Sequence, residues 1–280
     1  MKKIVLFLST SLFCLGATAQ VETPQPSPNS KIEQVVGLTD VTVSYSRPSK
    51  KGRTIFGGLV PYDKLWRTGA NANTKISFSD DVKIGGKELK KGEYAVFTKP
   101  GKENWEVIFY SDASNWGTPR NWDDSKVALK TTVKASALPM SVETFTILFS
   151  DFTMDSAKLN FVWDTTEVAF KIEVPSKKKA IASIEKVLAG PSANDYYQAA
   201  VFYKNTKDFA KAKQYIDKAV TLRKEPAFWH LRQQSLIYAA SGDKAGAIKA
   251  AKSSLELAKK AGNDDYVKLN QDSLKEWGAK

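Results

Sequence analysis

Apolar and polar residues alternate along much of the first half of the chain. In Val41–Ser46 (VTVSYS), two valines and a tyrosine alternate with a threonine and two serines. Alternation with a period of two residues is typical of a strand with one buried face. The same pattern predicts further strands at Lys75–Ser79, Val82–Ile84, Glu93–Lys99, Asn104–Tyr110, Val127–Lys134, Val142–Ser150, Ala157–Asp164 and Glu167–Val174.

Glycine and proline mark the turns between these strands. Gly85 and Gly86 separate VKI from KEL, and two glycines readily adopt the positive φ angles of a two-residue hairpin. Pro100 and Gly101 lie between two further strongly patterned strands. Many short strands with no helical pattern between them predict an antiparallel β-sandwich or a jelly-roll-like barrel over residues 31–175.

The hydrophobic period changes after Pro175. In AIASIEKVLAGP, apolar residues recur at helical spacing before a terminating glycine and proline. Ser192, followed three residues later by Asp195, resembles a capping box at the start of the next helix. The chain is therefore expected to be α+β, with a β-domain followed by a helical domain over residues 176–280.

The helical part contains an internal repeat. Small and aromatic residues recur after 35 positions: Tyr203, Asp208, Ala212, Ile216 and Ala219 return as Tyr238, Asp243, Ala247, Ala251 and Ser254. This spacing resembles the tetratricopeptide repeat, although the usual period is about 34 residues and Ser254 stands where a last alanine is expected. We expect six helices in three hairpins, with a capping helix over Asn263–Trp277.

The first nineteen residues have the composition of a secretory signal peptide. Lys2 and Lys3 precede the mostly apolar run Ile4–Leu15, and small residues at positions 17–19 suit a cleavage site. We therefore expect an exported protein, periplasmic or extracellular, whose chain starts at Gln20. The apolar run is too short to span a membrane and no later stretch is long enough, so the protein is not expected to be membrane-spanning.

Residues 20–30 are proline-rich and polar, which is typical of a flexible lead-in.

Cys14 is the only cysteine and lies within the predicted signal peptide, so the exported chain is expected to form no disulfide and no thiolate site. An acylated Cys14 is the alternative, and the bulky Phe13 before it argues against lipoprotein processing.

Charge is distributed unevenly between the two parts. Residues 20–175 hold 20 Lys and Arg against 19 Asp and Glu, whereas residues 176–280 hold 20 against 11, a net charge of +9. Lysines spread along amphipathic helices usually form a solvated face. Nucleic-acid readers favour arginine, of which the helical part has only Arg223 and Arg232, so no nucleic-acid partner is expected.

Three long motifs carry a family resemblance: YSRPSKKGRTIFG (Tyr45–Gly57), LVPYDKLWRTGANANTKI (Leu59–Ile76) and KKGEYAVFTKPG (Lys90–Gly101). They resemble a family of secreted bacterial proteins known as domain of unknown function 2911. The resemblance covers residues 27–174 and supports the exported location and the β fold. It implies no activity, substrate or catalytic residue.

Histidine is too scarce for most catalytic centres. His230 is the only histidine and lies in the helical part, where we interpret it as a packed helix residue. The β-domain can therefore hold neither a Ser-His-Asp or Cys-His centre nor a histidine-bound metal, and we expect no cofactor. Carboxylates remain as catalytic candidates, best represented by Asp112, Asp123 and Asp124, which are otherwise turn and surface residues.

Aromatic, arginine and asparagine side chains in two loops suggest ligand binding instead. The segment LWRTGANANTKISF places Ile76 and Phe78 inward on a strand, after residues that tolerate a left-handed backbone. The loop SDASNWGTPRNWDD carries two tryptophans suited to stacking on a sugar or gripping a peptide. The candidate ligand-binding residues are Trp66, Arg67, Asn71, Asn73, Trp116, Arg120 and Trp122.

Three of these candidates also have a structural interpretation. Trp116 and Trp122 could cover a sheet edge or a barrel end, and Arg67 could bond the carbonyl oxygens of its own turn. We therefore carry three hypotheses for the protein. The first is a non-enzymatic protein that binds a carbohydrate or peptide and docks a protein partner through its helices. The alternatives are a carboxylate-dependent hydrolase acting on glycan and a purely structural envelope component.

Overall fold

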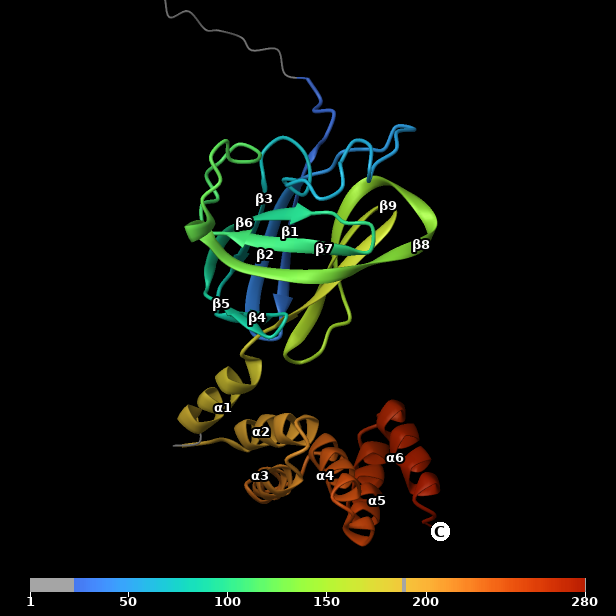
Figure 1. The fold of residues 1–280 in the computed structure, drawn as a ribbon. Helices are drawn as coiled ribbons and strands as arrows, with labels where there is room; N and C mark the ends of the chain where they lie inside the picture. Colours follow the sequence, from blue (N-terminus) through green and yellow to red (C-terminus); the bar gives the residue numbers. More distant parts are fainter. Residues whose placement is uncertain (1–22, 188–189, 280) are drawn as a thin grey trace, which may run out of the picture. The chain divides into compact units, whose positions relative to one another are not determined.

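The computed structural model describes residues 23–187 and 190–279. The predicted signal peptide, residues 1–19 with Cys14, lies outside these residues. The chain divides after Val174 into two compact units, which we call the β unit and the helical unit (Figure 1).

The described part of the β unit forms one antiparallel sheet in the strand order β1-β2-β3-β6-β7-β8-β9-β4-β5. Most predicted strands are present, with ends shifted by a residue or two. Their bounds are β1 (Asn29–Val36), β2 (Thr39–Ser46), β3 (Thr74–Phe78), β4 (Val82–Ile84), β5 (Lys87–Leu89), β6 (Gly92–Lys99), β7 (Asn104–Tyr110), β8 (Val127–Ser150) and β9 (Ser156–Glu173).

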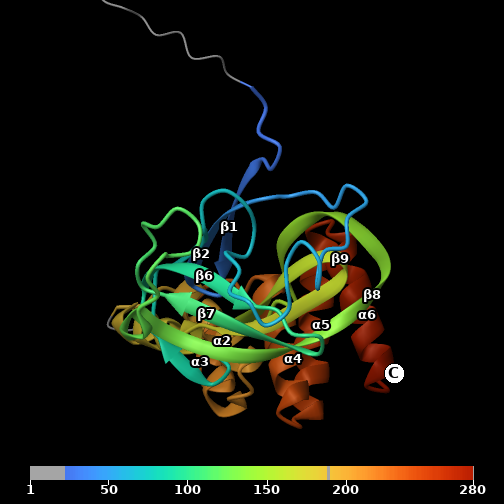
Figure 2. The same ribbon diagram turned by 45° about the horizontal axis from the view of Figure 1, so that its top comes forward.

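The prediction of separate strands in the second half of the unit is wrong at two places. Val127–Lys134 and Val142–Ser150 are parts of the single long strand β8. The strand β9 likewise unites the predicted strands Ala157–Asp164 and Glu167–Val174. The pairing of β8 with β9 shifts register on both sides of Val142, and Pro139 lies within the irregular stretch. Because bulges accommodate a proline and bend a strand, β8 continues through a sequence that looks like a turn. Figures 1 and 2 show β8 as one curved ribbon.

Strand β8 joins the two halves of the sheet. Its first part pairs with β7 and its second part with β9, so β8 belongs to both ladders. The inner faces of the two halves share one hydrophobic core. Across this core Tyr45 of β2 lies 5.8 Å from Phe145 of β8, and Phe109 of β7 lies 6.0 Å from Phe170 of β9, measured between ring centroids. Burial of this apolar surface is the main stabilising contribution of the unit.

The side-chain orientations predicted for β2 and β3 are confirmed. Val41, Val43 and Tyr45 of β2 are buried in the core, and so are Ile76 and Phe78 of β3. The residues between them point to the opposite face of the sheet, because side chains of a strand alternate in direction. This opposite face, which we call the outer face, carries the polar side chains of both strands.

Strand β1 has no counterpart in the predicted set. It begins at Asn29, within the segment that composition assigned to a flexible lead-in, and pairs with β2 from Asn29↔Ser46 to Val36↔Thr39. The residues just before it are also fixed, since Pro28 O accepts a hydrogen bond from Arg47 N at 2.9 Å. A polar lead-in composition does not reveal these contacts, because the partners lie on β2.

The described residues of the helical unit form six helices, as predicted. They are α1 (Ser176–Val187), α2 (Ala193–Asn205), α3 (Phe209–Thr221), α4 (Phe228–Ala240), α5 (Lys244–Lys260) and α6 (Asp264–Glu276). The predicted capping box is present, with Ser192 and Asp195 bonded reciprocally at the start of α2. Asn263 caps α6 by accepting a hydrogen bond from Tyr266 N, which agrees with the predicted last helix.

The repeated small residues bring the helices of this unit together. α2 packs against α3, α4 against α5, and α6 against α5. Ala212 and Ala219 of α3 and Ala247 and Ala251 of α5 are completely buried. Without bulky side chains at these positions, neighbouring helix backbones approach closely, and the repeat therefore has a packing role.

Candidate binding site

Trp66 is anchored in the core of the β unit. Its backbone exchanges two hydrogen bonds with Thr98 of β6, at 2.7 and 2.9 Å. Its indole ring lies 5.9 Å from the ring of Trp163 and 5.3 Å from that of Phe145, and its Nε1 donates to Gly69 O at 3.1 Å. These contacts give Trp66 a structural role at the base of the loop that follows it.

Arg67 connects the two loops that carry the candidate residues. Its Nη1 donates to the carbonyl oxygen of Asn71 at 3.1 Å, which is the turn-stabilising bond considered from the sequence. Gly117 of the second loop packs against the same guanidinium group. A Cβ at Gly117 would lie 2.7 Å from Nη1, so a side chain there would collide with Arg67. The loop after Trp66 and the loop before Trp122 therefore meet at Arg67.

The loop after Trp66 holds a strained backbone. Thr68 has a φ of 55°, which is unusual for a β-branched residue, and Asn71 has a φ of 57°. Thr68 is buried, and its hydroxyl group lies 3.1 Å from that of Thr98. Asn71 Nδ2 donates to Ser27 O at 3.1 Å. The surrounding contacts thus fix the strained residues, and the side chain of Asn71 is used in holding the loop.

Asn73, two residues further on, differs from Asn71 in one important respect. Its side chain is only 3% exposed, yet neither Nδ2 nor Oδ1 has a hydrogen-bond partner in residues 23–187 and 190–279. Buried amides almost always make such bonds, because leaving one unpaired costs about 1–3 kcal/mol. Asn73 also lines a surface depression of about 560 Å³. Both amide atoms are themselves buried, so a ligand in the depression would reach them only after the residues around them rearrange.

We call this hollow the Asn73 depression. It lies on the outer face across β1, β2, β3 and β6, where Lys31, Ser44 and Lys75 form one cross-strand row. Its lining includes Asn29, Ser30, Ser44, Ser46, Asn73, Lys75 and Glu93. The polar residues of these strands therefore make up the floor of the depression. The same alternation that directs apolar side chains into the core directs these polar side chains to the outer face.

A second hollow adjoins the first. It has a volume of about 640 Å³, and we call it the Asp112 depression. Lys75 and Glu93 line both hollows, and Lys75 Nζ lies 3.7 Å from Glu93 Oε1. The remaining lining residues are Ser111–Ser114 and Lys126. The two hollows thus form one polar surface with the loop after β7 as its wall.

Trp122 holds this wall in place. Its ring lies 5.6 Å from that of Phe97 and 4.6 Å from that of Tyr110, on the outer face of β6 and β7. Its Nε1 donates to Asp124 Oδ1 at 2.8 Å. Trp122 therefore covers a small second hydrophobic cluster on the outer face of two interior strands, and not a sheet edge or a barrel end as its structural interpretation expected. By contrast, Trp116 is 77% exposed and Arg120 is also exposed, so both are accessible to a ligand.

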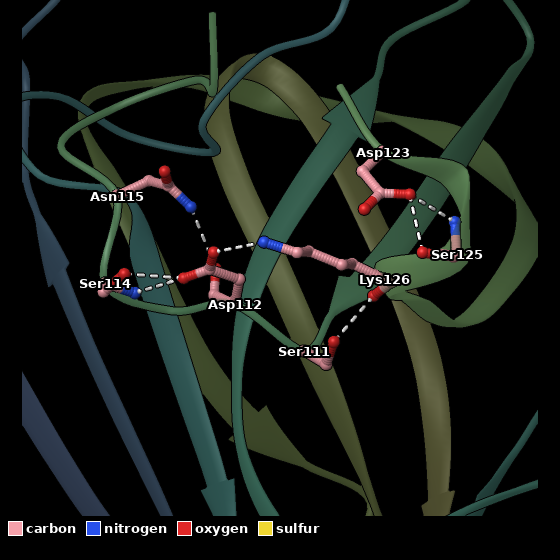
Figure 3. A network of polar contacts seen from close by, with 7 residues as sticks. All are labelled: Ser111, Asp112, Ser114, Asn115, Asp123, Ser125 and Lys126. Carbon is pink, nitrogen blue, oxygen red and sulfur yellow. Dashed lines mark hydrogen bonds and ion pairs between the residues drawn. The ribbon is translucent and has the colours of Figure 1, made fainter. Parts of the chain in front are cut away.

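The carboxylates considered for catalysis make local contacts (Figure 3). Asp112 accepts hydrogen bonds from Lys126 Nζ at 2.8 Å and from Ser114 Oγ at 2.6 Å. Lys126 and Ser114 hold the pKa of Asp112 well below its ordinary value. Asp123 accepts from Ser125 N and Ser125 Oγ, and this hydroxyl group lowers the pKa of Asp123. Both groups therefore stay ionised, whereas a glycosidase requires one carboxyl group with a raised pKa to act as acid.

The low pKa of Asp112 can be measured directly. We expect its carboxyl carbon to titrate below the ordinary aspartate range in an NMR pH titration, and we expect Lys126→Met to raise that pKa towards the ordinary value. Lys130→Met is the matched control, because Lys130 contacts Glu106 instead. An Asp112 that titrates alike in all three proteins would contradict the ion pair.

His230 has a packed position in the helical unit, as predicted. It is 1% exposed and its ring stacks on Tyr197 at 4.7 Å between centroids. Burial lowers its pKa, with a smaller contribution from Arg223.

Within residues 23–187 and 190–279, no three His, Cys, Asp or Glu side chains gather closely enough to hold a metal ion. None of the helices in the described parts of the chain is long and apolar enough to cross a membrane.

A family model described as a protein of unknown function, DUF2911, matches residues 27–172. The chain belongs to this family. No curated protein and no solved structure matches the chain. The match begins two residues before β1 and ends one residue before the end of β9. The Asn73 depression, the Asp112 depression and both loops therefore lie within the family region.

Proposed function

We propose that this DUF2911 protein is an exported, non-enzymatic binding protein. Its β unit recognises a polar ligand, a carbohydrate or a peptide, on the outer face, and its helical unit docks a protein partner. The observation that carries the proposal is the polar surface formed by the Asn73 depression and the Asp112 depression, which share Lys75 and Glu93 in their lining. Export is supported by the composition of residues 1–19.

The helical unit and the finer fold support this interpretation. The 35-residue spacing and the buried small residues favour a tetratricopeptide-like arrangement, a fold class that commonly binds proteins. Two sheet halves that share one core favour a sandwich with a jelly-roll-like curvature. Binding is preferred over hydrolysis because Lys126 and Ser125 keep the candidate carboxylates Asp112 and Asp123 ionised.

A blocking substitution tests the location of the site. Ser44 lies on the outer face between Lys31 and Lys75, so Ser44→Trp fills the floor of the Asn73 depression without entering the core. We expect the chain without residues 1–19 to bind a ligand from a panel of glycans and peptides, and Ser44→Trp to reduce the affinity at least about tenfold, because the indole occupies the ligand's place.

The control for this experiment is Thr132→Trp, which adds the same side chain at an exposed position of β8. Affinity is measured by calorimetry on the full set of proteins. Retained binding in Ser44→Trp would contradict the assigned location, and failure of every glycan and peptide to bind would contradict the binding function itself.

A further inference from the structure

Strand β1 forms an open edge of the sheet. It stands at one end of the strand order, and among the described residues it pairs only with β2. The eight residues of β1 include no proline, and their pairing with β2 runs without a shift in register. The strand at the other end of the order, β5, is only three residues long. Short length, proline and bulges are common means of keeping a sheet edge from pairing, and β1 has none of them.

One hydrogen bond shows which backbone groups of β1 lie on the open edge. Arg47 N donates to Pro28 O at 2.9 Å, so the backbone of Pro28 is directed towards β2. In an antiparallel ladder every second residue bonds to the same neighbouring strand. The even-numbered residues of β1 therefore bond to β2, and the N–H and C=O groups of the odd-numbered residues point to the open edge. These residues are Asn29, Lys31, Glu33 and Val35, and all of them are exposed.

The charges along this edge select a particular partner strand. Lys31 and Glu33 form an ion pair on the outer face, two residues apart. When two antiparallel copies of β1 pair about a two-fold axis at Ile32, Lys31 of each copy lies opposite Glu33 of the other. Shifting one copy by two residues in either direction places lysine opposite lysine or glutamate opposite glutamate, which is destabilising. The ion pair therefore favours a second copy of β1 in a single register.

The same register also satisfies the rest of the edge. Asn29 of each copy lies opposite Val35 of the other, so every outward-directed residue meets another one, and each such pair can exchange two hydrogen bonds. Gln34 Nε2 donates to Val35 O at 2.9 Å, and this exposed side chain can give way to a backbone donor. On the inner face, Ile32 packs partly buried against the core and meets Ile32 of the other copy. The pairing thus uses the whole length of β1.

We propose that β1 pairs with β1 of a second copy of this chain, which joins the two sheets into one antiparallel sheet. The proposal goes beyond ligand binding and does not depend on it. It has a consequence for the candidate site, because Asn29 and Lys31 line the Asn73 depression. Val35 and Glu33 of the second copy lie directly opposite them and extend that lining, and the two depressions flank the two-fold axis on one outer face.

Reversing the charges at the edge tests the proposal. Sedimentation velocity of the chain without residues 1–19, over a series of concentrations, is expected to show a monomer–dimer equilibrium. Lys31→Glu places like charges opposite each other at two symmetric positions, and so does Glu33→Lys, so each variant should dimerise at least about tenfold more weakly. An equimolar mixture of the two variants should restore the dimer, as should the double variant Lys31→Glu/Glu33→Lys, because opposite charges then face each other again.

Lys171→Glu is the matched control for the charge reversals. Lys171 forms an ion pair with Glu173, also two residues apart, but on β9, which is an interior strand in the order. This variant makes the same change of charge away from the open edge. It is expected to dimerise as the unsubstituted chain does.

An introduced cysteine measures the register independently of charge. The chain without residues 1–19 has no cysteine of its own. Ile32→Cys places two thiol groups directly opposite each other at the two-fold axis, within reach of a disulfide. Gln34→Cys, two residues further along the same face, places them about 14 Å apart along the strands, which is too far. After mild oxidation, non-reducing electrophoresis should show a covalent dimer for Ile32→Cys alone.

The outcomes are distinct from those for ligand binding. A chain that stays monomeric at every concentration would overturn the proposal, and so would a dimer that is equally strong in Lys31→Glu, Glu33→Lys and Lys171→Glu. A covalent dimer from Gln34→Cys without one from Ile32→Cys would contradict the register. A monomer that binds a glycan or peptide would leave the proposed function standing, whereas a dimer without any such ligand would leave only the β1 pairing.

Discussion

Replacing Trp66 with alanine is expected to lower the free energy of unfolding of the β unit by about 3 kcal/mol. The substitution removes an indole ring that stacks on Trp163 and contacts Phe145, and it leaves a cavity beside the core. It also removes the donor to Gly69 O, so a partly buried carbonyl group loses its partner. Urea denaturation followed by near-ultraviolet circular dichroism measures the change through the remaining buried tryptophans.

Trp116→Ala is the matched control for this experiment. Trp116 carries the same side chain and was an equal candidate from the sequence, but it is largely exposed. Its removal should change the unfolding free energy by less than about 0.5 kcal/mol. Equal effects of the two substitutions would show that Trp66 does not have the packed position described here.

Gly69→Ala is expected to destabilise the β unit by about 2–3 kcal/mol. Gly69 has a φ of +150°, which side chains rarely tolerate, and an added Cβ would lie 2.9 Å from the backbone oxygen of Ser46. Because backbone cannot move aside as a flexible side chain can, either β2 or the loop after Trp66 must shift. Thermal and urea unfolding of the chain without residues 1–19 measure the effect.

Gly86→Ala separates the steric contribution from the backbone conformation. Gly86 also has a positive φ, +75°, but an added Cβ would meet nothing within 4 Å. We expect this variant to lose only about 1 kcal/mol, the cost of the left-handed conformation alone. If Gly69→Ala is no more destabilising than Gly86→Ala, the close approach between the loop and Ser46 does not exist in solution.

Much of the β fold follows from the alternation of residues. The inward positions of β2 and β3 are predicted correctly because period-two alternation depends only on local sequence. The continuity of β8 is not predictable in this way. Pro139 and its neighbours have the composition of a turn, and only the irregular pairing with β9 keeps them in the strand. Register along a partner strand is a long-range property that a local pattern does not contain.

The candidate site shows the same limit at the level of single residues. Asn71 and Asn73 are chemically identical and two positions apart, and the sequence assigned them the same role. In the fold, Asn71 bonds Ser27 from the segment before β1, whereas Asn73 is buried with no partner in the described residues. Which of the two amides finds a hydrogen-bond partner depends on contacts with distant residues. Trp116 and Trp122 diverge for a similar reason, since only Trp122 reaches Phe97 and Tyr110.

The shared strand β8 also has a thermodynamic consequence for the whole β unit. One half of the sheet takes its last strand from the first part of β8, and the other half takes its first strand from the second part. Neither ladder can lose β8 without exposing an edge of the other and opening the common core. The two halves therefore form a single cooperative unit, in which local opening of one half is coupled to global unfolding of both.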